Sequence, residues 1–174
     1  MPRYRHDPSK DLVGFLVGDV MYAVRIDVVR EIVNPLAIVD LPRAPDTVKG
    51  VADYRGEVVP VVDLRERFGL PEQKLSRKTK WIVVDAAAKR TGPAIGQGAV
   101  AGARYAALVV DSVTEVFGLA GGELRPAPPL GKGDAQRGIE GVTTLGERLV
   151  FVLDARAFGA VTDVVMGYSI PVIG

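Results

Sequence analysis

Gly50–Leu64 reads GVADYRGEVVPVVDL, and Gly141–Ala155 reads GVTTLGERLVFVLDA. The two stretches align without a gap, from the Gly-Val pair at the start to Asp63 and Asp154 near the end. In each, a valine-rich run follows a corner that contains glycine, which is typical of a β-hairpin. This likeness predicts that the chain is built from one structural unit used twice.

Two shorter blocks repeat in the same order. Asp27–Ile32 resembles Asp111–Val116, and Leu41–Pro45 resembles Leu124–Pro128. The offsets imply a unit of about 80 to 90 residues that occurs twice. Half of this chain would bury too little surface to be stable alone. We therefore expect two small β-barrels that pack as one body and share a hydrophobic seam.

The composition agrees with a folded, mostly β protein. Hydrophobic residues make up 48% of the 174 and charged residues 25%, so wholesale disorder is excluded. Short apolar runs broken by Gly and Pro are typical of barrels and sandwiches. Helical periodicity is confined to segments such as Leu64–Phe68 and Ala155–Met166. The apolar runs are LVGFLV (12–17), MYAVRI (21–26), EVVPVVDL (57–64), WIVVD (81–85), YAALVVDSV (105–113) and RLVFVLD (148–154).

The charge balance and the missing residue types exclude several partners. Lys and Arg number 22 and Asp and Glu 21, so no bulk field attracts nucleic acid or an anionic membrane. The absence of cysteine removes disulfides, thiolate catalysis and sulfur-ligated metals. No apolar stretch approaches the roughly 18 to 20 residues of a membrane helix, and no signal peptide is recognisable. We expect a cytoplasmic protein without direct membrane insertion.

The motifs of common enzymes are also missing. The one histidine, His6, lies in a polar leader without a fixed partner, which makes a poor general base. The GKG sequence at 131–133 is followed by Asp, not by the Ser or Thr of a phosphate-binding loop. Asp63 and Asp154 close equivalent strands, and we interpret them as N-caps of helical turns. We therefore expect no catalytic residue, no metal and no cofactor.

The chain divides into a repeated body and three segments outside the repeat. Residues 1–11 form a polar leader, and the body spans 12–160. Residues 91–104 (TGPAIGQGAVAGAR) are interpreted as a flexible hairpin loop, because a dinucleotide-binding loop would be followed by a helix. Residues 161–174 form an apolar tail.

Two surface features are candidates for binding. At the corner Tyr54-Arg55-Gly56, Gly56 can take the positive φ of a tight turn and hold Arg55 in solvent. Arg55 is either a surface arginine paired with Glu57 or an anchor for a protein partner. In DVVREIV (27–33), alternation places Val28 and Ile32 in the core. It leaves Val29 beside Glu31, in an exposed apolar patch of the kind that marks contact sites.

Further motifs complete a family pattern. The chain resembles the CheW-like domain of bacterial chemotaxis coupling proteins over about residues 12–160. The matching first-half segments are YAVRI (22–26), V-x-EI (29–32), LP-x-AP (41–45), V-x-GV (48–51), RG (55–56) and VPVVDLR (59–65). The second half supplies VD-x-V-x-EV (110–116), RPAP (125–128), I-x-GV (139–142) and LD (153–154).

The resemblance implies two five-stranded barrels of the Src-homology-3 type and a non-catalytic adaptor. Its implied partners are the cytoplasmic hairpin tip of a methyl-accepting chemoreceptor and the regulatory domain of a CheA-type histidine kinase, with room for ring or array assembly. Val29, Glu31, Gly50 and Arg55 fall at the family's receptor-coupling positions, whereas the kinase-side residues stay unassigned. Tyr54 replaces the family's usual leucine and enlarges the receptor corner.

Two other functions stay open. Tyr54 and the 91–104 segment allow a scaffold of a non-chemotaxis pathway, such as motility or development, recruited to a different receptor array. A small-ligand-binding or hydrolytic β protein would require a concave polar pocket.

Overall fold

The structure of this chain is a computed structural model that describes residues 7–44, 46–86, 105–119, 124–127, 138–159 and 162. Within these ranges most of the regular secondary structure is β. The predicted 91–104 loop, most of the leader and nearly all of the 161–174 tail lie outside the described residues. The strands are β1 (Leu12–Val17), β2 (Val20–Arg25), β3 (Val29–Val33), β4 (Val48–Tyr54), β5 (Glu57–Asp63), β6 (Lys80–Asp85), β7 (Tyr105–Val110), β8 (Ser112–Phe117), β9 (Ile139–Leu145) and β10 (Arg148–Leu153). The helical turns are η1 (Pro8–Lys10), η2 (Ile26–Val28), α1 (Leu64–Arg67) and η4 (Ala155–Phe158).

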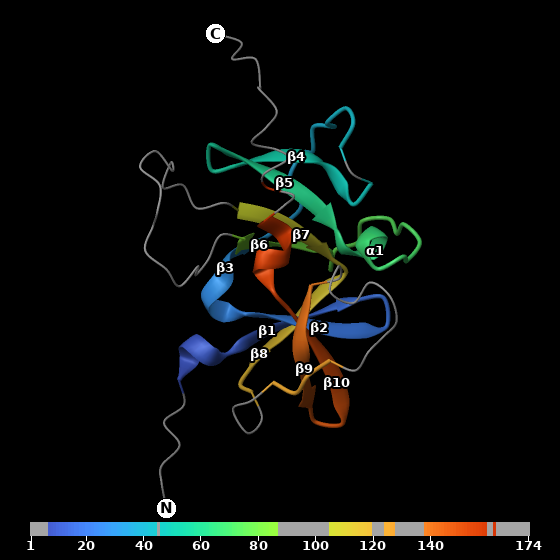
Figure 1. The fold of residues 1–174 in the computed structure, drawn as a ribbon. Helices are drawn as coiled ribbons and strands as arrows, with labels where there is room; N and C mark the ends of the chain where they lie inside the picture. The colour runs from blue at the N-terminus through green and yellow to red at the C-terminus, as the bar shows by residue number, and fades with distance from the viewer. Residues whose placement is uncertain are drawn as a thin grey trace, which may run out of the picture.

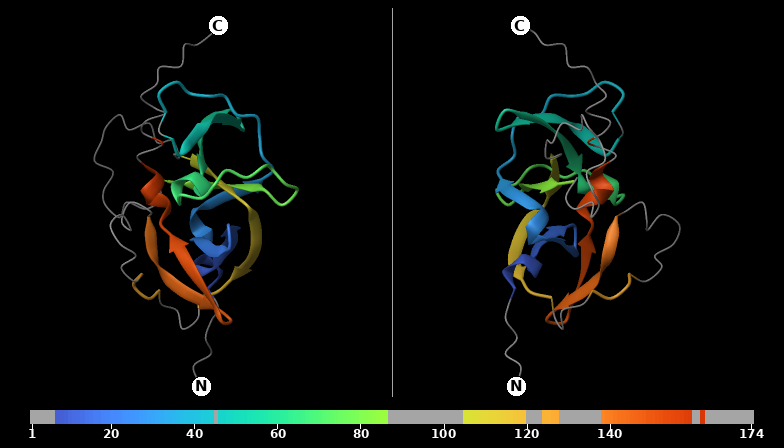
Figure 2. Two further views of the ribbon diagram at one scale, coloured as in Figure 1. Left: turned by 90° about the vertical axis from the view of Figure 1, so that its right-hand side faces the viewer. Right: turned by 60° about the vertical axis from the view of Figure 1, so that its left-hand side comes forward.

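The strands form two five-stranded sheets (Figure 1). One, the central sheet, has the order β3-β6-β7-β5-β4 and uses one continuous part of the chain. The other, the terminal sheet, has the order β8-β1-β2-β10-β9 and joins both ends of the described chain. The views in Figure 2 place the hairpin of β4 and β5 at the opposite end of the molecule from the hairpin of β9 and β10. The prediction of a mostly β fold with two five-stranded units is confirmed.

Each sheet combines strands from both repeats. In the terminal sheet β2 pairs in parallel with β10, and in the central sheet β7 pairs in parallel with β5. The antiparallel pairs correspond as well: β1 with β2 matches β6 with β7, and β9 with β10 matches β4 with β5. The two halves are therefore interlocked, because each repeat gives its first two strands to one sheet and its last three to the other.

The apolar side chains form three clusters that follow this arrangement. Val61 and Trp81 lie in a cluster inside the central sheet, and Val152 lies in its counterpart inside the terminal sheet. The largest cluster lies between the sheets and includes Phe15 from β1 and Leu108 from β7. Strands such as β5 are therefore buried on both faces, which explains their nearly continuous apolar sequence. This shared cluster is the expected hydrophobic seam.

Local features repeat with the strands. The Asp63 carboxylate accepts a hydrogen bond from the Arg65 backbone N–H at 3.0 Å, and the Asp154 carboxylate accepts one from the Arg156 N–H at 2.9 Å. Both aspartates are N-caps, as predicted, of α1 and η4. An aspartate at this position satisfies a backbone donor that the helical turn leaves without a partner.

Two predicted elements differ from the structure. The run YAALVVDSV is not one strand, because the chain leaves β7 in the central sheet and enters β8 in the terminal sheet at Asp111. The helix expected from Ala155 begins as the 3₁₀ turn η4 (Ala155–Phe158), and most of its predicted remainder lies outside the described residues. Apolar patterning indicates burial but does not show where a strand changes sheets.

Candidate protein-interaction site

Three of the predicted contact residues meet at one end of the central sheet. The Arg55 guanidinium donates to both Glu31 carboxylate oxygens, each at 2.9 Å, and the Tyr54 hydroxyl donates to the same carboxylate. Arg55 also lies over the Tyr54 ring, 5.8 Å from its centre. Glu31 belongs to β3 and Tyr54 to β4, the two outer strands of the sheet. This group, which we call the edge cluster, links the two edges by side chains.

A β-bulge in β3 directs Glu31 toward the edge cluster. Val29 opposes Val84, but Glu31 opposes Val83, so the register shifts by one residue between them. Val84 belongs to the seam between the sheets, and Val83 belongs to the cluster inside the central sheet. An extra residue in one strand reverses the face of the residues that follow. The bulge therefore separates Val29 from Glu31, which strict alternation had placed on one face.

The hairpin between β4 and β5 turns through two residues with positive φ. Gly56 has φ +83° and Arg55 has φ +51°. The expectation for Gly56 is confirmed, but Arg55 also adopts a left-handed conformation that costs a non-glycine residue about 1 kcal/mol or more. At the aligned corner between β9 and β10 this position is Gly146, with φ +61°. Because glycine forms the corresponding turn between β9 and β10, the arginine side chain is not needed to form the turn between β4 and β5.

In the edge cluster the negative charge of Glu31 is balanced by the positive charge of Arg55. Hydrogen bonds from Arg55 and then from Tyr54 lower the pKa of Glu31. Burial of Tyr54, with the hydrogen bond to Glu31, raises the pKa of the phenol. Glu31 is therefore a carboxylate and Tyr54 a neutral donor at ordinary pH. The Arg55 side chain is 67% exposed, so most of its surface stays open to another protein.

Gly50 and Val29 have packing roles beside the edge cluster. Gly50 has φ +148°, and a Cβ atom there would lie 2.3 Å from the Val39 carbonyl oxygen. That oxygen accepts a hydrogen bond from the Val51 N–H at 2.9 Å, so only glycine lets the segment before β4 cross this strand. Val29 is half-buried and packs against the seam between the sheets, so the prediction that it lies in an exposed apolar patch beside Glu31 is wrong.

Two further interpretations of this surface are corrected. Ile32 was expected in the core but is 39% exposed, because the β3 bulge turns it outward. Arg55 pairs with Glu31, which lies 24 residues away in the sequence, and not with the neighbouring Glu57. Local sequence suggests only the nearby partner, since the approach of β3 to the hairpin depends on closure of the sheet.

A separate polar group, which was not predicted, links the two sheets to each other. The Arg65 guanidinium donates two 2.8 Å hydrogen bonds to the Asp111 carboxylate, which also accepts the Gly18 N–H at 2.7 Å. Asp111 marks the crossover from β7 to β8, Arg65 lies in α1, and Gly18 lies between β1 and β2. The repeat aligns Asp111 with Asp27. An aspartate that recurs at the same place in both repeats is a sequence signal for a structural role, and it could have identified Asp111.

The described residues contain no group of three His, Cys, Asp or Glu side chains arranged to hold a metal ion. Nor does any helix within them have the length and apolar character needed to cross a membrane.

Comparison with known proteins decides the family. The sequence profile of the CheW-like domain matches residues 11–160. This chain belongs to the CheW-like family. It is 30% identical over 146 residues to the chemotaxis protein CheW of Klebsiella aerogenes, covering 84% of this chain and 79% of that protein. It is also 30% identical over 128 residues to the protein FrzA of Myxococcus xanthus, covering 74% of this chain and 69% of that one.

The fold comparison agrees. The crystal structure of the scaffolding protein TtCheW from Thermoanaerobacter tengcongensis superposes with a TM-score of 0.68 at 25% identity, covering 87% of this chain and 88% of that one. The prediction of a CheW-like chemotaxis adaptor is confirmed at the level of family and functional class. The residues of its interfaces remain predictions.

Proposed function

We propose that this CheW-like chain is a non-catalytic adaptor that couples chemoreceptors to a histidine kinase, with the edge cluster on the receptor side. The observation that supports this most is Arg55, which keeps a left-handed backbone conformation where the aligned corner has Gly146. A side chain retained at a conformational cost favours a role outside the fold. The receptor-side surface consists of Glu31, Tyr54 and Arg55, with Val29 and Gly50 as supports.

An adaptor acts through linked binding equilibria. Each contact can be weak, in the class of interfaces below about 1,200 Å², because repetition in an array raises the overall affinity. A receptor signal passes when the two receptor states contact the adaptor differently and so change the state of the bound kinase. The interlocked sheets suit this role, since the two sheets pack on one shared hydrophobic cluster.

The test uses Arg55→Gly, Arg55→Ala and Glu31→Ala in binding assays with a receptor signalling fragment and with the kinase regulatory domain. Each variant is expected to weaken receptor binding about tenfold or more, as loss of a hot-spot side chain does. Kinase binding should stay unchanged, and each variant should still unfold in one cooperative transition. The matched control is Arg148→Ala, an exposed arginine at the other hairpin. Unchanged receptor binding in all three test variants would reject the assignment.

Similarity to FrzA is compatible with a second candidate, a scaffold of a chemosensory-like pathway outside chemotaxis. Co-purification from cells would decide between the two, because it identifies the receptor and the kinase that the chain binds.

A further inference from the structure

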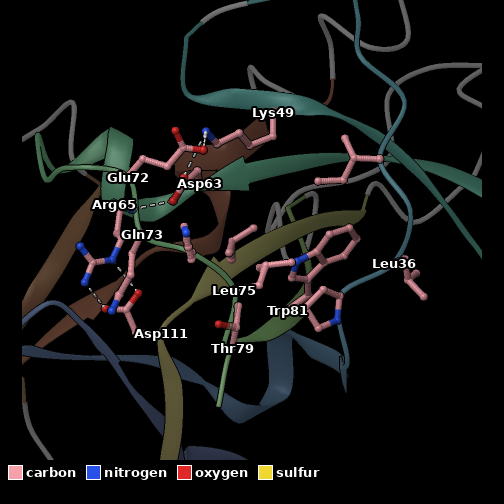
Figure 3. A pocket seen from close by; sticks show the side chains of 14 residues that line it. Leu36, Lys49, Asp63, Arg65, Glu72, Gln73, Leu75, Thr79, Trp81 and Asp111 are labelled. Atoms are coloured by element: carbon pink, nitrogen blue, oxygen red, sulfur yellow. Dashed lines mark hydrogen bonds and ion pairs between the residues drawn. The ribbon is translucent and has the colours of Figure 1, made fainter. Parts of the chain in front are cut away.

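A pocket lies on the central sheet (Figure 3). It has a volume of about 270 Å³ and is formed by residues 35–38 after β3, the end of β5, α1, residues 72–79, and strands β6 and β7. Figure 3 shows charged side chains such as Lys49 and Arg65 on one side and the apolar Trp81 and Leu36 on the other. None of the residues proposed above for receptor coupling lines it.

The apolar wall is unusually open to solvent. Leu36 is 38% exposed, Ile38 40% and Leu75 68%, whereas Trp81 beneath them is 1% exposed. Large aliphatic side chains gathered at one concave surface indicate a contact site, whereas single exposed ones are common on any protein. Three of the large hydrophobic residues exposed within the described ranges thus surround one pocket.

The charged side chains that line the pocket are balanced, with Lys49, Arg65 and Lys74 against Asp63, Glu72 and Asp111. Glu66, beside Lys49, adds one further carboxylate next to this wall. The Lys49 ammonium lies 3.3 Å from Glu72, 3.5 Å from Glu66 and 3.6 Å from Asp63. Partial burial by itself lowers the pKa of Lys49, but these carboxylates outweigh it and the pKa is raised. One ammonium therefore faces three negative groups. Glu72 is 81% exposed, so its carboxylate is free to turn toward an incoming cation.

Other basic groups only partly offset this excess. The Arg65 guanidinium is engaged by Asp111 through two hydrogen bonds. Lys74 also lines the pocket, but it adds one positive charge against an excess of two around Lys49. With Glu66 included, four carboxylates face three basic groups, and this one net negative charge favours a cationic group over an anionic one.

We propose that this pocket receives an aliphatic side chain of a protein partner, with an adjacent arginine or lysine of that partner bound by Glu66 and Glu72. The pocket is smaller than the roughly 300–1,000 Å³ of typical small-molecule sites, which favours one anchoring side chain over a whole ligand. The exposed aliphatic rim then covers the partner's backbone around that anchor. This surface is additional to the receptor-side edge cluster and does not depend on it.

The test uses Trp81, the only tryptophan in the chain, as a reporter in the pocket. The isolated protein is titrated with N-acetyl-leucyl-arginine amide while the indole N–H signal of Trp81 is followed by NMR. N-acetyl-leucyl-glutamate amide is the charge-reversed control, and N-acetyl-glycyl-arginine amide lacks the aliphatic anchor. A saturable shift is expected for the leucyl-arginine probe, with an affinity on the order of 1 mM. Binding of the glutamate control should be weaker by up to about fivefold, the upper range for one exposed ion pair. Binding of the glycyl control should also be weaker, because it buries no aliphatic side chain.

Two variants sharpen the test. Glu66→Gln combined with Glu72→Gln should remove the preference for the basic probe while leaving the free Trp81 signal in place, which verifies the fold. Lys49→Gln should strengthen binding of the basic probe, because it removes the competing ammonium. The proposal is overturned by equal affinity for the arginine and glutamate probes, by no saturable shift, or by weaker binding in Lys49→Gln. Any of these outcomes leaves the receptor assay with Arg55→Gly unaffected, so the two proposals fail separately.

Discussion

The β4–β5 and β9–β10 hairpins have the same place in the fold but carry different side chains. Both turn through a left-handed residue, which is Arg55 in one and Gly146 in the other. Tyr54 aligns with Leu145, so the first hairpin has a hydroxyl and a guanidinium where the second has neither. The first hairpin is joined to β3 through Glu31. The comparison shows that the turn requires only a left-handed residue, and that the hydroxyl of Tyr54 and the guanidinium of Arg55 are not needed to form it.

Features present in both repeats are the ones that build the fold. Val61 and Val152 are fully buried in corresponding clusters. Gly50 and Gly141 each lie beneath a carbonyl oxygen of a crossing segment. Residues that recur in both repeats are therefore expected to affect stability. Residues present in only one repeat, such as Tyr54 and Arg55, are expected to affect binding.

The largest effect is expected from a charge in either core. Val61→Asp and Val152→Asp should each abolish the cooperative folding transition, because an unpaired buried carboxylate costs several kcal/mol and the sheets share a seam. Circular dichroism melting curves measure this. A variant that loses only one sheet and keeps the other folded would contradict the interlocked arrangement.

Glycine replacement should distinguish the two crossings. Gly50→Ala places a Cβ 2.3 Å from the Val39 oxygen at a positive φ, and we expect destabilisation of about 3 kcal/mol. Gly141→Ala meets the Arg125 oxygen at 2.8 Å without a positive φ, so its cost should be smaller. Urea unfolding of both variants checks the order, and an equal or reversed order would show that backbone conformation is not the cause.

The polar link between the sheets should have a smaller effect. Asp111→Asn keeps the size of the side chain but loses charge-assisted bonds from Arg65, with an expected destabilisation of about 1–2 kcal/mol. The comparison is Asp154, whose exposed partner Arg156 aligns with Arg65 of the first repeat. We expect Asp154→Asn to cost less in the same urea experiment. A larger cost for Asp154→Asn would place the main polar link elsewhere.

The smallest effect is a pH dependence of the edge cluster. The pKa of Glu31 is lowered by Arg55 and Tyr54, so its stabilising effect is present above about pH 4.5, the ordinary value, and is lost as pH falls through the lowered pKa. NMR titration of the Glu31 carboxyl carbon should give a pKa below the ordinary value in the natural chain. In Arg55→Gly the pKa should rise. A pKa that does not move would mean that the ion pair is absent in solution.

Part of this fold was readable from the sequence because it depends on local signals. The aligned segments predicted both hairpins. The positions of Asp63 and Asp154 at strand ends predicted that they are N-caps of helical turns. The exchange of strands between sheets was not readable, because burial periodicity does not say which strands pair. The wrong prediction that Ile32 is buried has a similar origin, because one bulge in β3 reverses the alternation of side chains between the two faces of the strand.

The family resemblance indicated the residues of the proposed receptor site but not their geometry. The family resemblance indicated Glu31 and Arg55, but their ion pair joins strands at opposite edges of a sheet. The pocket around Lys49 gave no sequence signal, because its walls come from separate segments that only the fold brings together.

The most direct test of the adaptor assignment is a reconstituted mixture of receptor signalling fragment, histidine kinase and this chain, with kinase autophosphorylation as the readout. Receptor-dependent change in kinase activity should require the natural chain and should be lost with Arg55→Gly, which still binds the kinase and unfolds in one cooperative transition. Full receptor control in the presence of Arg55→Gly, or receptor control without the chain at all, would contradict the account.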